Sequence, residues 1–307
     1  MYVVETRDLV KKFDRHTAVD GVNLKIEKGI IFGLLGPNGA GKSTTINMIC
    51  GLLSPTSGTV TLLGRKVEES QRMIGYVPQN FALYSNFTAY ENLAFFGRLY
   101  RVGGSALKNN IDDALEFTGL LEARNKKAKT FSGGMLRRLN IACALVHKPE
   151  VMIMDEPTVG IDPQSRNHIM GAIRKMNENG VSVIYTSHYM EEIEALCDYI
   201  AIMDNGKIIS QGTKKELKDL VTDKVTLDIA VNDQTGVDLE KIKSIGGVSN
   251  VYSDDRSIRI TSEKDADNLN EILGYVLSKG VRATDIGYKE VTLETVFLSL
   301  TGKKLRD

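Results

Sequence analysis

Residues 30–44 read IIFGLLGPNGAGKST, an apolar run that leads through a glycine-rich turn to a lysine and two hydroxyl side chains. The apolar run at 30–35 is typical of a buried strand, and a helix is predicted over about 41–53. Glycines in the turn let successive backbone N–H groups point inward, where they can bind phosphate oxygens. Because the start of the helix adds a positive dipole at the same place, the stretch predicts a phosphate-binding loop.

The composition excludes some kinds of protein. The chain has 307 residues, of which 42% are hydrophobic and 25% charged, so it is long enough for one or two globular domains. Lysine plus arginine equals aspartate plus glutamate, at 39 each. Since proteins that mainly bind nucleic acid usually carry a basic excess, no nucleic acid partner is expected.

The sequence also indicates where the protein is located and whether its cysteines and histidines bind a metal. No apolar run approaches the roughly 20 residues that span a bilayer, and the first residues do not form a signal sequence, so a cytoplasmic location is predicted. The cysteines, Cys50, Cys143 and Cys197, form no CxxC pair and are expected to be reduced core residues. The histidines at 16, 147 and 168 show no metal-ligand spacing and are interpreted as structural.

Strands and helices alternate along residues 1–219, which predicts an α/β domain with a mainly parallel sheet. Asn205-Gly206 predicts a type I′ hairpin, and hence an antiparallel β piece attached to that sheet. Residues 83–148 are mostly helical in pattern and are expected to form a helical subdomain. The predicted strands lie at 30–35, 72–79, 151–155 and 181–187, and the predicted helices at 41–53, 88–100, 105–118 and 163–180.

The pattern changes after a short charged helix predicted at 213–221. The later elements follow the order strand, helix, strand, strand, helix, strand, which is that of a ferredoxin-like α+β domain. A last helix is predicted at 293–300, capped by Thr292 and ended by Gly302. We therefore expect a small accessory domain over 220–307. Its predicted elements lie at 225–231, 238–245, 248–252, 257–261, 265–278 and 283–289.

Two acids end the apolar strand at 151–155. Asp155 can hold Mg²⁺, directly or through water, and Glu156 can polarise an attacking water if the chain turns both carboxylates towards one site. A pair of acids at a strand end is also common for structural reasons. The phosphate loop complements the pair, because Lys42 can reach the β- and γ-phosphates of a nucleotide and Ser43 can bind Mg²⁺.

A second anion-binding helix end is predicted at Ser132-Gly133-Gly134. Ser132 can cap the helix, and two glycines leave the first backbone N–H groups uncovered. On its own such a tripeptide would be interpreted as a turn. Together with the phosphate loop and the paired acids, it gives the chain two helix ends suited to phosphate.

In this order, the motifs resemble those of the nucleotide-binding subunit of an ABC transporter, over about residues 1–215. The resemblance identifies 36–44 as a Walker A loop, 132–134 as the core of a signature motif and 151–156 as a Walker B strand with its catalytic glutamate. It implies a P-loop NTPase fold, ATP and Mg²⁺ as ligands, and ATP hydrolysis. The common signature has Leu and Gln where this chain has Phe131 and Met135.

The same resemblance implies roles for single residues. Gln79 resembles the Q-loop glutamine, Asp162 the D-loop aspartate and His188 the switch histidine that senses the γ-phosphate. Lys42, Glu156 and His188 are implied to be catalytic, and Ser43, Gln79 and Asp155 to bind Mg²⁺. The residues implied to bind ATP are Phe13, which would stack on adenine, and Gly36, Pro37, Asn38, Gly39, Ala40, Gly41, Lys42, Ser43, Thr44, Gln79, Ser132, Gly133, Gly134 and Asp162.

Three stretches narrow the resemblance to the ABC-2 type exporter branch, which includes the ATPases of daunorubicin resistance pumps. These stretches are SGGMLRR at 132–138, EPTVGIDP at 156–163 and LETVFLSLTG at 293–302. The resemblance implies a head-to-tail dimer of two identical chains on the cytoplasmic face of the cell membrane. It also implies a separate multi-span permease subunit that contacts residues 83–148.

Other functions remain open from the sequence. A soluble ABC ATPase with a ribosomal or nucleic acid partner usually has two cassettes or a long coiled-coil insertion, and this chain has neither. An ABC importer with a regulatory C-terminal domain is a closer alternative. The accessory domain can also be a regulatory or dimerisation module.

Overall fold

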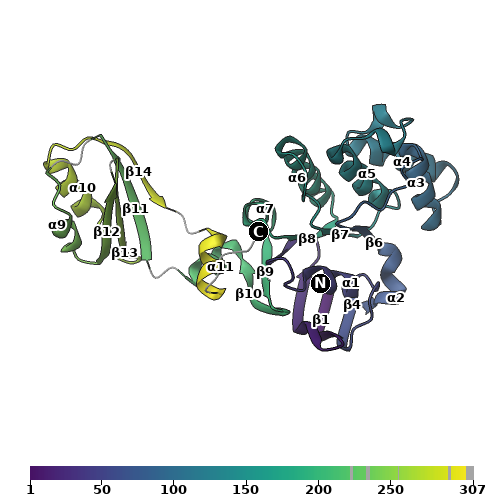
Figure 1. Ribbon diagram of the computed structural model, residues 1–307, viewed down its shortest axis with the longest axis horizontal. Helices are drawn as coiled ribbons and strands as arrows, with labels where there is room; N and C mark the ends of the chain where they lie inside the picture. Colours follow the sequence, from purple (N-terminus) through teal and green to yellow (C-terminus); the bar gives the residue numbers. More distant parts are fainter. Residues whose placement is uncertain (222–223, 233–235, 255, 290–291, 302–307) are drawn as a thin grey trace. The chain divides into compact units, whose positions relative to one another are not determined.

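The computed structural model describes residues 1–221, 224–232, 236–254, 256–289 and 292–301 (Figure 1). The chain divides into two compact units. The first consists of Met1–Lys214 with the end of the chain from Leu300, and the second of Lys215–Ser299. The domain boundary expected between residues 219 and 220 falls a few residues inside the second unit.

A six-stranded sheet forms the centre of the first unit, in the order β10-β9-β3-β8-β7-β6. Its neighbours pair in parallel from β9 to β6, and β10 alone runs antiparallel, next to β9. Every residue of β3, β7 and β8 is buried, as expected for parallel strands covered on both faces. The strands are β3 (Ile31–Leu35), β6 (Ile74–Val77), β7 (Val151–Asp155), β8 (Ser182–Ser187), β9 (Tyr199–Asp204) and β10 (Lys207–Thr213). The predicted parallel sheet is confirmed.

A second sheet in this unit is antiparallel, in the order β2-β1-β4-β5. Its strands are β1 (Tyr2–Phe13), β2 (His16–Glu27), β4 (Ser57–Leu62) and β5 (Arg65–Lys66). Helix α1 (Lys42–Ile49) shares one hydrophobic core with both sheets, through Ile46, Met48 and Ile49. The only antiparallel piece predicted for this unit was the hairpin at Asn205-Gly206, so this sheet was not predicted.

Three of the remaining helices in the first unit, α3, α4 and α5, share a hydrophobic core of their own. This core is centred on Leu93, Ile111, Leu115 and Leu139. The predicted capping box is present at Thr88, whose hydroxyl accepts the Glu91 N–H at 3.1 Å while the Glu91 carboxylate accepts the Thr88 N–H at 2.8 Å. The helices are α2 (Val67–Ser70), α3 (Ala89–Leu99), α4 (Gly104–Phe117), α5 (Gly133–Leu145), α6 (Pro163–Glu178) and α7 (Met190–Leu196), and short 3₁₀ turns span Gln71–Met73, Leu121–Ala123 and Ala128–Thr130.

Some predicted bounds differ from the structure for local reasons. Helix α1 ends at Ile49 and not at 53, because Gly51 takes a left-handed conformation with φ +70°. Strand β6 starts at Ile74 and not at 72, because the 3₁₀ turn Gln71–Met73 precedes it. The predicted type I′ hairpin is confirmed, since Asn205 and Gly206 both have positive φ.

The second unit is built around an antiparallel sheet in the order β12-β13-β11-β14. Its elements are β11 (Lys224–Val231), α9 (Leu239–Lys243), β12 (Val248–Asp254), β13 (Ser257–Glu263), α10 (Leu269–Ser278) and β14 (Ala283–Lys289). The core lies between the sheet and its two helices, with Ile229, Ile258, Ile260 and Val276 fully buried. This topology confirms the predicted ferredoxin-like arrangement.

Two further helices lie at the ends of this part of the chain, α8 (Lys214–Asp219) and α11 (Leu293–Thr301). Thr292 caps α11 as predicted, because its hydroxyl accepts the Thr295 N–H at 3.4 Å. The predicted end of this helix at Gly302 lies outside the described residues. Within the described ranges, no helix has both the length and the apolar character needed to cross a membrane.

Candidate functional site

The glycine-rich loop lies between the end of β3 and the start of α1, as the sequence predicts. A Cβ atom on Gly36 would overlap the carbonyl oxygen of Met203 in β9, and one on Gly41 would overlap that of Ala18 in β2. Gly41 also has φ +104°. Glycine is therefore required at positions 36 and 41, because the loop backbone lies directly against the backbone of β9 and of β2, one strand from each sheet.

The N-terminus of α1 faces the loop with its backbone donors. Gly41 is the N-cap residue and supplies no side-chain cap, so the first N–H groups of the helix remain for a ligand. The Lys42 side chain is buried and folds back over the loop, where its Nζ donates to the carbonyl oxygens of Gly36 at 2.8 Å and Pro37 at 3.1 Å. A cation and a helix N-terminus thus converge on one short segment, which suits phosphate oxygens.

Glu156 follows β7 and takes a left-handed conformation, with φ +47°, that is uncommon for a residue with a side chain. Its N–H donates to the hydroxyl of Thr186 at 2.9 Å, and that hydroxyl donates to Asp155 Oδ1 at 2.7 Å. Thr186 lies directly opposite Asp155 in the paired strand β8. The hydroxyl therefore fixes the backbone of Glu156 and the carboxylate of Asp155 at the same time.

The Glu156 carboxylate brings together side chains from three other segments. Its Oε1 lies 3.0 Å from Lys42 Nζ. Its Oε2 accepts from Gln79 Nε2 at 3.4 Å and lies 3.2 Å from His188 Nδ1, without the alignment of a hydrogen bond. Lys42 and Glu156 are both about 95% buried, so their charges interact in a poorly solvated environment. We call these four residues the Glu156 cluster.

The cluster lies at one edge of the parallel sheet. The loop follows β3, Gln79 follows β6, Glu156 follows β7 and His188 follows β8. These four strands are neighbours in the sheet and run parallel, so their carboxyl ends meet. Ligands of open α/β sheets bind outside the carboxyl ends of the strands, which is where the structure places these residues.

The acids near this edge provide oxygen ligands for a cation. Asp155 is buried, and its charge contributes, after burial itself, to raising the pKa of Cys50 and of Tyr76. In the described part of the chain, no group of three or more His, Cys, Asp or Glu side chains could hold a metal alone. Mg²⁺ usually takes one or two protein ligands together with substrate phosphates and waters, so this donor set fits Mg²⁺.

A buried arginine that was not predicted as a site residue supports Gln79. Arg137 of α5 donates to the carbonyl oxygens of Pro78 at 2.8 Å and Gln79 at 2.6 Å, and its guanidinium lies 4.8 Å from the Phe81 ring centre. Burial lowers the pKa of Arg137. In the sequence it resembles an exposed helical arginine next to Arg138, and no local signal separates the two.

The second predicted anion-binding end lies next to Asp162. Ser132 caps α5 by accepting the Met135 N–H at 3.3 Å, and Asp162 caps α6 by accepting the Ser165 N–H at 2.9 Å. A Cβ on Gly134 would overlap the side chain of Ser165, so the two helix starts are in contact. Among the described residues, no hydrogen bond or ion pair joins 132–134 to the Glu156 cluster.

Phe13, predicted to stack on adenine, lies at the end of β1 and is 46% exposed. Lys11 Nζ lies 5.1 Å from its ring centre. No ring contact or hydrogen bond within the described ranges joins Phe13 to the loop. The structure therefore leaves a partly exposed aromatic ring on the antiparallel sheet, apart from the cluster.

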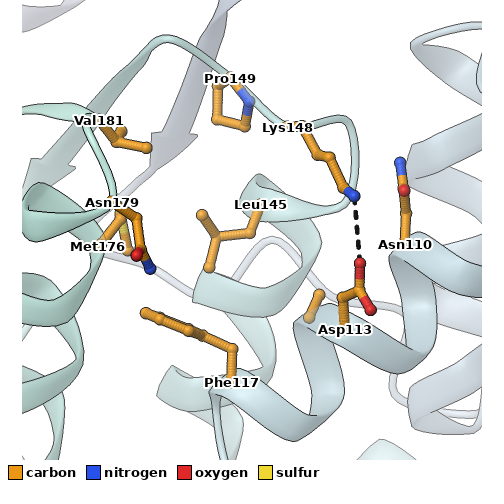
Figure 2. Close-up of a pocket in the computed structure, with 10 residues that line it drawn as sticks. Asn110, Asp113, Phe117, Leu145, Lys148, Pro149, Met176, Asn179 and Val181 are labelled. Atoms are coloured by element: carbon orange, nitrogen blue, oxygen red, sulfur yellow. Dashed lines mark hydrogen bonds and ion pairs between the residues drawn. The ribbon is translucent and has the colours of Figure 1, made fainter.

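A separate cavity of about 390 Å³ lies between α4, α5 and α6, with Phe117, Leu145 and Met176 in its apolar lining (Figure 2). A Lys148–Asp113 ion pair of 3.1 Å lies at its side. Residues 148, 149 and 181 in its lining precede β7 and β8, so the cavity is at the amino ends of these strands. It lies at the opposite edge of the sheet from the Glu156 cluster and is not part of that site.

The chain matches a protein-family model described as ABC transporter over residues 19–159. It is 42% identical to the linearmycin resistance ATP-binding protein LnrL of Bacillus subtilis, and the match covers 99% of this chain and 100% of LnrL. It is 35% identical to the daunorubicin/doxorubicin resistance ATP-binding protein DrrA of Streptomyces peucetius, with 99% and 94% covered. The Nod factor export ATP-binding protein I of Ralstonia nicotianae is 33% identical, with 99% and 95% covered.

Solved structures give the same fold. A nucleotide-free ATP-binding cassette from an ABC transporter superposes with a TM-score of 0.66 at 26% identity, covering 72% of this chain and 95% of that one. A dimeric post-hydrolysis state of the cassette MJ0796, bound to ADP and phosphate, superposes with a TM-score of 0.63 at 28% identity, covering 68% and 98%.

Proposed function

Because the chain belongs to the ABC transporter family, as an ATP-binding and ATP-hydrolysing subunit, we propose that the phosphate loop and the Glu156 cluster form its hydrolysis site. One observation carries this proposal: the Glu156 carboxylate contacts Lys42, Gln79 and His188. Each of these four residues follows a different strand of the parallel sheet. Chemically, the cluster joins a phosphate-binding cation to a base and an imidazole, the parts that phosphoryl transfer to water requires.

Binding of ATP starts at the loop. Backbone N–H groups at the start of α1 and the Lys42 ammonium bind the β- and γ-phosphates. Lys42 then exchanges its 3.0 Å ion pair with Glu156 for phosphate oxygens. This exchange frees the Glu156 carboxylate to accept a hydrogen bond from the attacking water.

Hydrolysis then uses the freed carboxylate. Glu156 orients the water and takes up its proton as the oxygen attacks the γ-phosphorus and ADP leaves. His188 lies on the other side of the same carboxylate and donates to the γ-phosphate. Positioned proton transfer of this kind contributes about 10²- to 10⁴-fold to a rate.

Mg²⁺ would be held by the Ser43 hydroxyl, by Asp155 and by the Gln79 amide oxygen, together with phosphate oxygens. When bound, the ion neutralises charge on the β- and γ-phosphates. The protein prepares this position by orienting Asp155 through the Thr186 hydroxyl.

We further propose that two copies of the chain pair head to tail, so that residues 132–134 and Asp162 of one copy complete the ATP site of the other. Within one chain the start of α5 contacts the start of α6 and is not joined to the Glu156 cluster by a described hydrogen bond or ion pair. The related cassette bound to ADP and phosphate is dimeric. Phe13 would contact the adenine ring.

The partner in the membrane would be a separate permease, which places this chain at the cytoplasmic face. An exposed aromatic cluster suits such docking, because Tyr84 has its ring centre 5.0 Å from that of Phe87 and 4.7 Å from that of Phe95, and all three are about 40% exposed. Phe81, exposed to a similar degree, lies two residues after Gln79. Relatives named for drug resistance and for export support transport out of the cell.

The test is affinity purification of the Glu156→Gln chain with Mg-ATP from detergent-solubilised membranes of its own cells, followed by mass spectrometry. We expect a multi-span membrane protein to co-purify. Recovery of ribosomal or chromosomal proteins with no membrane protein would keep the ATPase chemistry but overturn the transport function.

A further inference from the structure

A second buried carboxylate lies behind the hydrolysis site and takes no part in the chemistry proposed above. Glu192 of α7 is 3% exposed. Its Oε2 accepts three hydroxyl hydrogen bonds, and its Oε1 lies 3.3 Å from the guanidinium Nε of a partly exposed arginine. The donors to Oε2 are Thr158 at 2.8 Å, Tyr185 at 2.9 Å and Ser187 at 3.0 Å, and the arginine is Arg166 of α6.

This set of partners explains how the charge can be buried. An isolated carboxylate is strongly disfavoured inside a protein unless hydrogen bonds and an opposite charge compensate it. Burial and the charge of Glu192 together raise the pKa of Tyr185, so this phenol remains a donor at neutral pH. Glu192 is thus the common acceptor of three buried hydroxyl groups that belong to two different segments.

One of these segments carries the switch histidine. Ser187, which donates to Glu192, also accepts the N–H of Tyr189 at 2.9 Å. The backbone on both sides of His188 is therefore tied to one carboxylate. The Tyr189 ring lies 4.1 Å from the imidazole, and Arg166 lies 5.2 Å from the Tyr189 ring, which adds a second path from the Glu192 ion pair to His188.

The other segment is the turn that carries Glu156. Thr158 is fully buried two residues after Glu156, and its hydroxyl contacts both Glu192 and Tyr185. The same turn is closed by a hydrogen bond from the Val159 N–H to the Glu156 carbonyl oxygen at 3.4 Å. A shift of the Glu192 carboxylate would therefore move both the Glu156 turn and the His188 segment.

We propose that Glu192 is a positioning residue for ATP hydrolysis: by holding Thr158 and Ser187, it sets the distance between the Glu156 carboxylate and the His188 imidazole. The inference rests on the proposed roles of Glu156 and His188. Glu192 itself touches neither the loop nor Lys42 in the described contacts, so it acts on the geometry of hydrolysis and not on ATP binding.

Glu192→Gln tests the proposal, with Glu191→Gln as the matched control. Glu191 is the preceding residue of the same helix and is exposed. Misplacement of reacting groups by about 1 Å can lower a rate by about 100-fold. We expect kcat of Glu192→Gln to fall by roughly 10- to 100-fold while KM for ATP changes by less than about twofold, and Glu191→Gln to match the unaltered chain.

A double variant separates positioning from general loss of structure. If Glu192 acts through Ser187, then Ser187→Ala alone lowers kcat, and Glu192→Gln combined with Ser187→Ala is no slower than Glu192→Gln alone. Rates that multiply, a rise in KM that accounts for the loss, or a Glu192→Gln rate equal to that of Glu191→Gln would each overturn the proposal. Ser187→Ala carries the test by itself if Glu192→Gln does not fold.

Measuring Glu156→Gln beside these variants distinguishes a failure of the proposed hydrolysis site from a failure of the proposed role of Glu192. Full-rate turnover in Glu156→Gln removes the proposed hydrolysis site, whatever Glu192→Gln does. Slow turnover in Glu156→Gln with normal turnover in Glu192→Gln leaves the hydrolysis site in place and removes only the positioning role.

Discussion

Glu156→Gln should separate ATP binding from ATP hydrolysis more cleanly than any other single change. The amide keeps the size of the side chain and one acceptor oxygen but cannot take a proton from water. A general base contributes about 10²- to 10⁴-fold, so kcat should fall by that factor, which corresponds to about 2.7 to 5.4 kcal/mol in the barrier.

The same change should strengthen ATP binding. In the structure the carboxylate holds Lys42 Nζ at 3.0 Å, and phosphate must replace it there. Removing this competitor, and the repulsion between carboxylate and γ-phosphate, should gain about 1 to 2 kcal/mol, or roughly 5- to 30-fold in affinity. The variant should therefore accumulate as an ATP-bound dimer.

The assay has two parts and one control. Equilibrium binding of ATP is measured without Mg²⁺, to stop turnover, and single-turnover hydrolysis is measured after Mg²⁺ is added. Glu150→Gln is the control, because Glu150 lies just before the same strand and makes a half-exposed ion pair with Lys28 at 3.3 Å. Weaker ATP binding by Glu156→Gln, or hydrolysis as fast as in Glu150→Gln, would refute the exchange of partners at Lys42.

Three other changes give distinct outcomes. Lys42→Ala should abolish ATP binding, because the loop loses its only described cation, and unchanged affinity in a binding titration would disprove the phosphate-loop assignment. Arg137→Ala should lower kcat about tenfold or more, because it releases the backbone of Gln79. The control Arg138→Ala loses only carbonyl contacts at residues 118 and 119 and should keep its kcat. Equal rates of the two variants in steady-state ATPase assays would contradict this role of Arg137. Gly134→Ala should keep the ATP affinity of the single chain but lose ATP hydrolysis and dimerisation, because the start of α5 cannot take a Cβ beside Ser165. Dimerisation is measured by light scattering, and a stable ATP-bound dimer of this variant would argue against the head-to-tail pairing.

Local chemistry explains what could be predicted from the sequence. The phosphate loop, the cap of α3 and the strand that ends at Asp155 each depend on a few adjacent residues, and the structure places these elements where the sequence predicted them. In β1 the apolar alternation is broken, in line with the several register shifts of its pairing with β2, so this strand could not be predicted, whereas β2 alternates over Val22, Leu24 and Ile26 and carried a signal that was missed.

Features that depend on pairing between distant segments could not be predicted in this way. The role of Thr186 follows from its register with Asp155 across β7 and β8, which the strand sequences alone do not specify. Glu156 takes a left-handed conformation that its residue type does not favour. The burial of Arg137 depends on residues 78 and 79, which approach it from far along the chain.

The arrangement of the site separates binding from hydrolysis in a way that kinetic data can test as a whole. The groups that first bind the β- and γ-phosphates, Lys42 among them, come from one continuous segment, the loop and the first turn of α1, while Gln79, Glu156 and His188 follow three other strands. Changes in the loop should therefore act mainly on ATP affinity. Changes at the supports of the strand ends, such as Thr186, Glu192 and Arg137, should act mainly on kcat, because they alter the relative positions of groups that the loop does not hold.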